Sequence, residues 1–74
     1  KAHPKDERAD RARLFLGDVL LQLGETTASL SQFDQAIESQ PEGPYVEDAK
    51  FGRAKALEAL KRDDDALKQY QELA

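Results

Sequence analysis

The sequence predicts an all-helical fold, a right-handed α-solenoid of two antiparallel helix hairpins. Three observations predict it. The chain has 74 residues and resembles itself when it is shifted by 37 positions, half of its length. Apolar residues recur at three- and four-residue steps, as on one face of a helix, and no segment shows the period-two alternation of a strand. Gly24 and the segment 40–44 interrupt this pattern where helices are expected to end.

The internal repeat covers the whole chain. Identical residues superpose at the shift of 37, namely Pro4 on Pro41, Ala12 on Ala49, Leu20 on Leu57, Leu23 on Leu60, Leu30 on Leu67 and Gln32 on Gln69. Similar residues also superpose, namely Leu14 on Phe51, Gly17 on Ala54, Ser29 on Ala66 and Phe33 on Tyr70. Such a period is typical of stacked helical hairpins. We therefore expect one domain over residues 1–74, with repeats at about 5–41 and about 42–74, that forms part of a longer array.

The first helix is expected to follow Asp6, an N-cap residue, with Glu7 and Asp10 in its first turns, where acids favour the helix dipole. Gly24 is expected to end it, because glycine accepts the left-handed conformation of a helix terminus. Its predicted apolar face consists of Ala9, Ala12, Leu16, Val19, Leu20 and Leu23. Apolar residues off this face, which indicate contacts on more than one side, are Leu14, Phe15 and Leu21.

Thr26 or Thr27 is expected to cap the second helix, before a break at residues 40–44. Pro41 disfavours helix at the residue before it, and Pro44 suits the first position of the third helix. The apolar positions of the second helix are Leu30, Phe33 and Ile37. Those of the third helix are Val46, Ala49, Ala56, Leu57 and Leu60.

The third helix is expected to end in Lys61-Arg62, whose charges suit the negative end of the helix dipole. Asp63 or Asp64 is expected to cap a fourth helix. The apolar positions of this last helix are Ala66, Leu67, Tyr70 and Leu73.

Composition excludes several classes of function. Eleven Lys and Arg against fifteen Asp and Glu give a net charge of −4 without a basic stripe, which argues against nucleic acid or an anionic membrane as a partner. The chain has no cysteine for a disulfide or a thiolate metal site, and no apolar run long enough to insert into a bilayer. We expect no cofactor and no metal, and we expect Lys1 to be a cut end.

No catalytic constellation is visible. The one histidine is His3, Ser29 and Ser31 have no histidine near them in sequence, and the four glycines are scattered rather than gathered in a phosphate-binding loop. The run 63–65 is three aspartates without the alternating acids, glycine and distal glutamate of a calcium loop. We interpret this run as a helix cap and first turn, and we predict a protein that is not an enzyme.

The chain resembles the tetratricopeptide repeat family over essentially its whole length. In that family, small and large apolar positions of the first helix precede a small, an aromatic and a small position of the second helix, and a proline closes the repeat. In the first repeat these residues are Gly17, Leu20, Ser29, Phe33, Ala36 and Pro41. In the second they are Ala54, Leu57, Ala66, Tyr70 and Leu73. The chain departs from the pattern with Arg13 and Lys50 at the early aromatic position, Arg53 at an apolar position and Leu73 at a small one.

The repeat is also longer than the usual ~34 residues. Its joint, Pro41-Glu42-Gly43-Pro44-Tyr45, is similar to that of bacterial envelope proteins of this family, including outer-membrane-assembly lipoproteins. The absence of cysteine is compatible with cytoplasm or periplasm.

The resemblance implies a protein or peptide partner, because the first helices of successive repeats line a concave groove in this family. The groove positions that it implies are Arg11, Leu14, Asp18, Leu21, Gln22, Asp48, Phe51, Lys55, Glu58 and Ala59. An apolar floor beside opposite charges suits an amphipathic helix or an extended peptide. Members that clamp a C-terminal carboxylate use Lys and Asn at positions held here by Leu14, Asp18, Asp48, Gly52 and Lys55, so we expect no such ligand.

Two readings of these residues stay open. In the first, the chain is a binding scaffold whose groove holds a peptide or a partner helix. In the second, Leu14 and Phe51 pack against an adjacent repeat, and the chain is a structural or oligomerisation segment that acts through its open ends. The apolar residues of the last helix then allow self-association through that helix.

Overall fold

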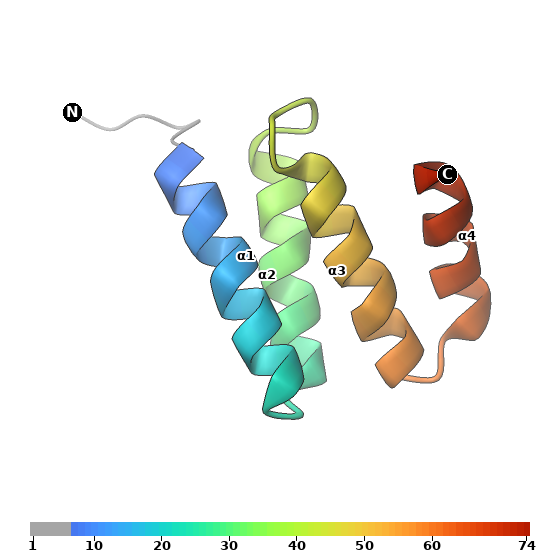
Figure 1. Ribbon diagram of the computed structural model, residues 1–74. Helices are drawn as coiled ribbons and strands as arrows, with labels where there is room; N and C mark the ends of the chain where they lie inside the picture. Colours follow the sequence, from blue (N-terminus) through green and yellow to red (C-terminus); the bar gives the residue numbers. More distant parts are fainter. Residues whose placement is uncertain (1–6) are drawn as a thin grey trace.

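A computed structural model describes residues 7–74, with only the backbone of Glu7, and places them in four helices and three short connections (Figure 1). The helices are α1 (Glu7–Gln22), α2 (Thr26–Ser39), α3 (Val46–Ala59) and α4 (Asp63–Leu73). No strand is present within residues 7–74. The predicted all-helical class and the order of two hairpins are confirmed.

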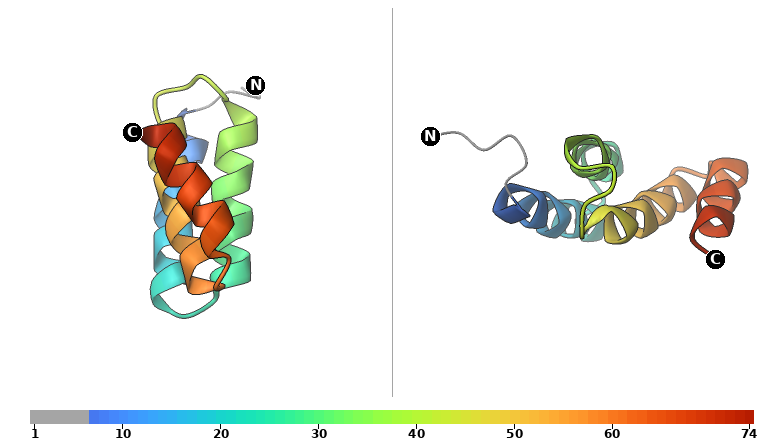
Figure 2. Two further views of the ribbon diagram at one scale, coloured as in Figure 1. Left: turned by 90° about the vertical axis from the view of Figure 1, so that its right-hand side faces the viewer. Right: turned by 90° about the horizontal axis from the view of Figure 1, so that it is seen from above.

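The helices pack in sequence. α2 lies against both α1 and α3, α1 also contacts α3, and α4 packs on α3. Seen from above in Figure 2, α1 and α3 lie side by side, α2 covers one side of this pair, and α4 lies at the end far from α1. Within the described part of the chain, α2 and α4 make no backbone contact. The third helix therefore joins the two hairpins.

The ring of Phe33 is the centre of the core. It is 1% exposed and lies between two glycines, Gly17 of α1 and Gly52 of α3. A methyl group added at Gly17 would lie 2.8 Å from Cε1 and Cζ of this ring. Ala36 and Ala49 are buried beside the ring, and the half-buried side chains that pack against them are Leu14 and Ile37. Small residues on both neighbours thus let three helices approach one aromatic side chain.

Two buried polar groups fix the first hairpin. Asp10 is 2% exposed and accepts hydrogen bonds from Arg13 Nη1 and Gln40 Nε2, both at 2.8 Å, which ties the start of α1 to the end of α2. Ser29 is fully buried and donates its hydroxyl to the carbonyl of Gly17 at 2.7 Å. Asp10 was expected as a dipole-favourable acid of the first turn, and in the structure it joins two helices.

Both hairpin turns have the same hydrogen bonds. After α1, Gly24 N–H donates to Leu21 and Glu25 N–H to Leu20, with Gly24 at φ 85°. After α3, Lys61 N–H donates to Glu58 and Arg62 N–H to Leu57, with Lys61 at φ 65°. This pair of bonds is the Schellman motif, which needs a left-handed residue at its centre. The predicted stop at Gly24 is confirmed.

The expected helix caps are wrong by one or two residues. α2 begins at Thr26 and α4 at Asp63, and the residues before them, Glu25 and Arg62, make no side-chain capping bond. The reason is that Glu25 and Arg62 are the last residues of the Schellman turns, in which their N–H groups bond to the preceding helix. The residue after each of them is already helical. Asp6 lies outside the described residues.

The third helix also differs from the expected one at both ends. Pro44 lies in a turn closed by Val46 N–H and the carbonyl of Gly43 at 3.4 Å, where proline fits the second position, and the helix begins after it. The helix ends at Ala59, so the pair Lys61-Arg62 lies in the turn rather than in the last helical turn.

The predicted apolar face of α1 is largely wrong. Asp10 and Gly17 are buried on this helix, whereas Ala9, Ala12, Leu16 and Leu23 are exposed, Leu23 by 70%. Val19 and Leu20 are half-buried. The side that packs on α2 is the side of Gly17, because only there can the backbone approach the ring of Phe33.

Candidate functional site

The predicted groove residues lie mostly at the surface of α1 and α3. The exposed ones are Arg11, Asp18, Gln22, Asp48, Phe51, Lys55, Glu58 and Ala59. Leu14 and Leu21 are half-buried, and Leu14 packs against the core cluster around Phe33. Leu14 therefore contributes to the packing of the first hairpin, and only part of its side chain is open to a partner.

The structure brings three of these residues together with Tyr70 of α4. The Phe51 ring is 49% exposed and meets the ring of Tyr70 edge-on, with the centroids 5.8 Å apart and the planes at 66°. The ammonium group of Lys55 lies 5.1 Å from the centroid of Phe51, within the range of a cation–π contact. The Tyr70 hydroxyl donates to Glu58 Oε1 at 3.1 Å. We call Phe51, Lys55, Glu58 and Tyr70 the aromatic cluster.

The aromatic cluster combines apolar surface with one positive and one negative side chain, Lys55 and Glu58. Burial raises the pKa of the Tyr70 hydroxyl above its ordinary value of 10.0, and the hydrogen bond to Glu58 and the negative charge of Glu58 raise it further. The hydroxyl is therefore a neutral donor at physiological pH. One half-exposed ring remains open for an apolar side chain of a ligand, next to one cation and one acid.

The other residues of the predicted groove are not joined to this cluster. Within residues 8–74, no hydrogen bond or ion pair links Arg11, Asp18 or Asp48 to it. They are exposed charges on the same two helices.

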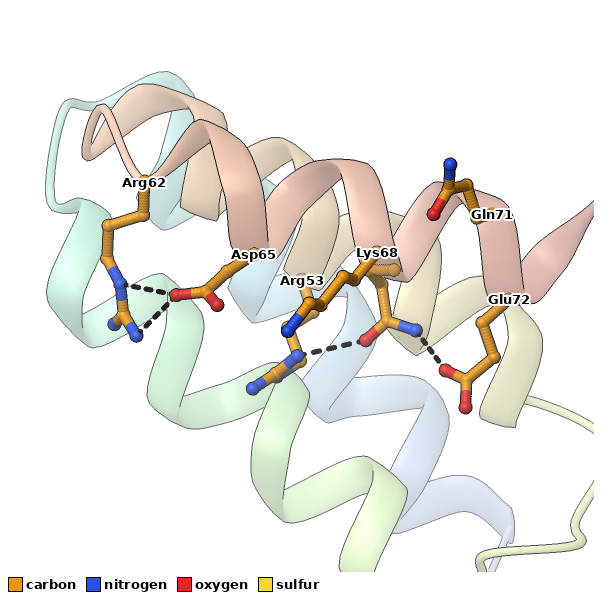
Figure 3. Close-up of a pocket in the computed structure, with 7 residues that line it drawn as sticks. Arg53, Arg62, Asp65, Lys68, Gln71 and Glu72 are labelled. Atoms are coloured by element: carbon orange, nitrogen blue, oxygen red, sulfur yellow. Dashed lines mark hydrogen bonds and ion pairs between the residues drawn. The ribbon is translucent and has the colours of Figure 1, made fainter.

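A second polar feature lies on α4, where a hollow of about 470 Å³ is open to solvent (Figure 3). Its lining residues are Arg53, Arg62, Asp65, Lys68, Gln69, Gln71 and Glu72. Arg53 donates from Nε to Asp34 of α2 at 2.8 Å and from Nη1 to Gln69 of α4 at 3.0 Å. Gln69 donates in turn to Glu72 at 2.6 Å. These polar groups bond mainly one another, and Arg53 thereby links α2 and α4, whose backbones make no contact.

The described residues were also compared with the geometry of a metal site. No cluster of three His, Cys, Asp or Glu close enough for an ion occurs within residues 7–74. Asp63, Asp64 and Asp65 form the first turn of α4, where acids stabilise the helix dipole, and Asp65 pairs with Arg62 at 2.8 Å. His3 lies outside the described residues. No helix of this part of the chain is long and apolar enough to cross a bilayer.

Comparison with known families agrees with this architecture. A family model described as Tetratricopeptide repeat matches residues 1–44 and again residues 16–74. The chain belongs to the tetratricopeptide repeat family. A search of curated proteins and a search of solved structures found no significant match.

Tetratricopeptide repeats are protein–protein interaction modules and typically have no enzymatic activity. Most of the positions that define the repeat in this chain are buried, whereas Leu20, Tyr70 and Leu73 are half-buried and Pro41 is exposed. In the first repeat Gly17, Ser29, Phe33 and Ala36 are buried, and in the second Ala54, Leu57 and Ala66 are buried.

Two side-chain contacts were not found from the sequence, namely the bond of Arg53 with Gln69 and the bond of Tyr70 with Glu58. Gln69 was only noted as a repeat match of Gln32, yet it is buried and bonded to Arg53. Arg53 stands where the family has an apolar residue, and this departure was the available signal for a buried polar partner. Tyr70 was identified only as the aromatic position of the second repeat, and its contact with Glu58 depends on the crossing of α3 and α4.

Proposed function

We propose that this tetratricopeptide repeat chain is a non-enzymatic binding scaffold whose exposed face on α3 holds an amphipathic helix or an extended peptide. The observation that supports this proposal best is the aromatic cluster. An aromatic ring that is about half exposed, fixed from the side by Tyr70 and flanked by Lys55, is a ready contact for an apolar anchor residue.

The charges around the ring define the ligand further. Lys55 favours an acidic residue one helical turn from the anchor, because both would lie on the same face of a ligand helix. Glu58 is already bonded to Tyr70, so its remaining lone pairs favour a donor at the other side of the anchor. The proposed ligand is therefore an amphipathic segment with an aliphatic anchor between an acid and a base.

The proposal is tested with a displayed library of amphipathic peptides that is selected on the native chain. The dissociation constant of a selected peptide is then measured for the native chain, Phe51→Ser and Lys55→Glu. Each variant should bind at least tenfold more weakly, a loss of about 1.4 kcal/mol. Leu14→Glu is unsuited to this test, because Leu14 packs against the core cluster.

The matched control is Leu67→Ser, which removes another exposed apolar side chain, 56% exposed, from α4. Binding by this variant should stay within about twofold of native, since Leu67 is not part of the aromatic cluster. A selected peptide that binds the Phe51→Ser variant as tightly as the native chain would contradict the proposal that the aromatic cluster holds the ligand.

A structural role through the exposed side of α4 is the second candidate, and the exposure of Leu67 favours it. In this case the chain acts as a segment of a longer array. Leu67→Ser, rather than the variants of the aromatic cluster, then weakens the association of α4 with its neighbour. The same set of variants therefore separates the two functions.

A further inference from the structure

Arg53 connects two helices that lie apart. α2 and α4 both pack on α3, and their own backbones make no contact within the described part of the chain. The guanidinium group of Arg53, on α3, donates from Nε to Asp34 of α2 at 2.8 Å and from Nη1 to Gln69 of α4 at 3.0 Å. A polar link between α2 and α4 therefore runs through this one side chain.

The guanidinium group fixes the relative position of its two acceptors. It is planar and its N–H groups point in set directions, so both bonds form only when Asp34 and Gln69 lie at one separation and angle. The amide of Gln69 is held at its other end as well, because its Nε2 donates to Glu72 at 2.6 Å (Figure 3). Glu72 in turn lies 3.8 Å from the ammonium group of Lys50 on α3. The amide thus cannot turn to follow a moving partner.

The burial of Gln69 makes its bond to Arg53 important for the packing of α4. The buried residues of α4 are Ala66 and Gln69. A placement of α4 that separates Gln69 from Arg53 leaves the oxygen of a buried amide unpaired, which is unfavourable. The bond therefore selects one placement of α4 among those that apolar packing alone would allow.

The link replaces an apolar contact of the family pattern. Arg53 stands at an apolar position of the tetratricopeptide repeat, and its equivalent at the shift of 37 residues is Leu16. Apolar burial is non-directional, whereas a guanidinium group with two bonds specifies an angle and a distance. The second repeat thus has a directional contact at this position.

The same placement of α4 determines the geometry of the aromatic cluster. Gln69 and Tyr70 are consecutive, and consecutive residues of a helix point about 100° apart. Gln69 meets Arg53, and Tyr70 meets Phe51 and Glu58. α4 is therefore held to α3 on two sides. A shift of α4 that breaks the bond to Arg53 also moves the Tyr70 ring against Phe51.

We propose that Arg53 is a positioning residue, which fixes α4 relative to α2 and thereby holds Tyr70 in place against Phe51. Its effect on a ligand rests on the binding function proposed above, whereas its effect on the position of α4 does not. Loss of the link loosens α4 and weakens ligands of the aromatic cluster, although Arg53 is not a member of that cluster.

The position of α4 is measured with spin labels. The chain has no cysteine, so Glu38→Cys on α2 and Gln71→Cys on α4 place two labels at exposed positions that take no part in the link. Gln71 lies far along α4 from the turn that joins it to α3, so it reports a swing of the helix. Pulsed electron paramagnetic resonance then gives the distribution of distances between the labels.

Variants of the link should broaden this distribution. Arg53→Leu removes both bonds, Arg53→Lys keeps the charge without the planar fork, and Asp34→Ala removes the acceptor on α2. The double variant of Arg53→Leu and Asp34→Ala should be no broader than Arg53→Leu alone, because both changes remove the same link. The matched control is Arg62→Leu, which removes another arginine of the hollow. Its partner Asp65 is only three residues away, so the distribution should stay native.

Two further measurements connect α4 to the aromatic cluster. The chain has two tyrosines and no tryptophan, so its near-ultraviolet circular dichroism reports tyrosine packing, and Tyr70→Phe gives the share of Tyr70. Arg53→Leu should lose this share. It should also weaken a selected peptide about two- to thirtyfold, the range for residues that act on a site without contacting the ligand. Arg62→Leu should change neither.

Far-ultraviolet circular dichroism shows which variants keep native helicity, and Arg53→Lys serves in place of Arg53→Leu if the latter unfolds. A distribution that stays as narrow as native in the folded Arg53 variants, or that broadens equally in Arg62→Leu, would overturn the proposal. A broadened distribution with an unchanged Tyr70 signal would overturn the connection to the aromatic cluster. If no peptide binds the native chain, the binding function fails, and the label distances and the Tyr70 signal still decide the role of Arg53.

Discussion

The close approach of Gly52 to Phe33 gives the sharpest prediction of stability. In a helix, replacing glycine by alanine normally stabilises by about 1 kcal/mol, because alanine loses less backbone entropy. Here the added methyl group would overlap Cε1 and Cζ of a ring that is 1% exposed and lies between two helices. The ring has no room to turn, so α3 or the ring must move.

The required shift sets the size of the effect. Carbon atoms in contact prefer about 3.5–4.0 Å, so the ring and α3 must separate by about 1 Å at Gly52. Gly17, where the methyl group would lie 2.8 Å from the same atoms, needs a smaller shift. Overpacking costs about 1–3 kcal/mol, and the helix preference of alanine offsets part of it. We expect a net loss of about 1–2 kcal/mol for Gly52→Ala and a smaller one for Gly17→Ala.

Urea unfolding followed by circular dichroism measures both variants. For a domain of this size, the expected loss at Gly52 corresponds to a drop in melting temperature of about 5–15 °C. Phe33→Leu shortens the ring side chain and should make Gly52→Ala much less harmful, with a coupling of about 0.5–3 kcal/mol between the two sites. A Gly52→Ala variant that is as stable as native, or more stable, would refute the reasoning about the ring.

Three further predictions follow from single contacts. Ser29→Ala should lower the free energy of unfolding by about 1 kcal/mol, measured by urea unfolding, because it removes the buried 2.7 Å bond to the carbonyl of Gly17. Lys61→Gly should raise the same quantity by about 0.5–1 kcal/mol, since Lys61 has φ 65° where the first repeat has Gly24, and unchanged stability would contradict this. The pKa of Tyr70 is raised by folding, so its hydroxyl loses its proton first in the unfolded chain and the free energy of unfolding should fall as pH rises above 10.0; the fall should be smaller in Tyr70→Phe, and equal falls would be evidence against the raised pKa.

The repeat pattern predicted the core better than the apolar period did. Of the six residues that the family pattern identified in the first repeat, Gly17, Ser29, Phe33 and Ala36 are buried, Leu20 is half-buried and Pro41 is exposed. The apolar period of α1 identified a helix but assigned the wrong side to the core. A period shows that one side of a helix is apolar, and it contains no information about which neighbour covers that side.

The close contact of Phe33 with Gly52 was not predictable by superposing the repeats. The equivalent of Gly52 in the first repeat is Phe15, so the position does not look like one that needs a small residue. The requirement arises only when a preceding helix brings an aromatic ring against it, which α2 does for α3. The pairing of Tyr70 with Glu58 likewise joins residues of different helices and depends on how α4 crosses α3.

The same contrast between α1 and α3 bears on function. α3 is covered by α2 on one side and by α4 on another, and its exposed face, with Phe51 and Lys55, is the one that we propose for a ligand. α1 contacts α2 and α3 and keeps exposed apolar side chains on another side, among them Phe15 and Leu23.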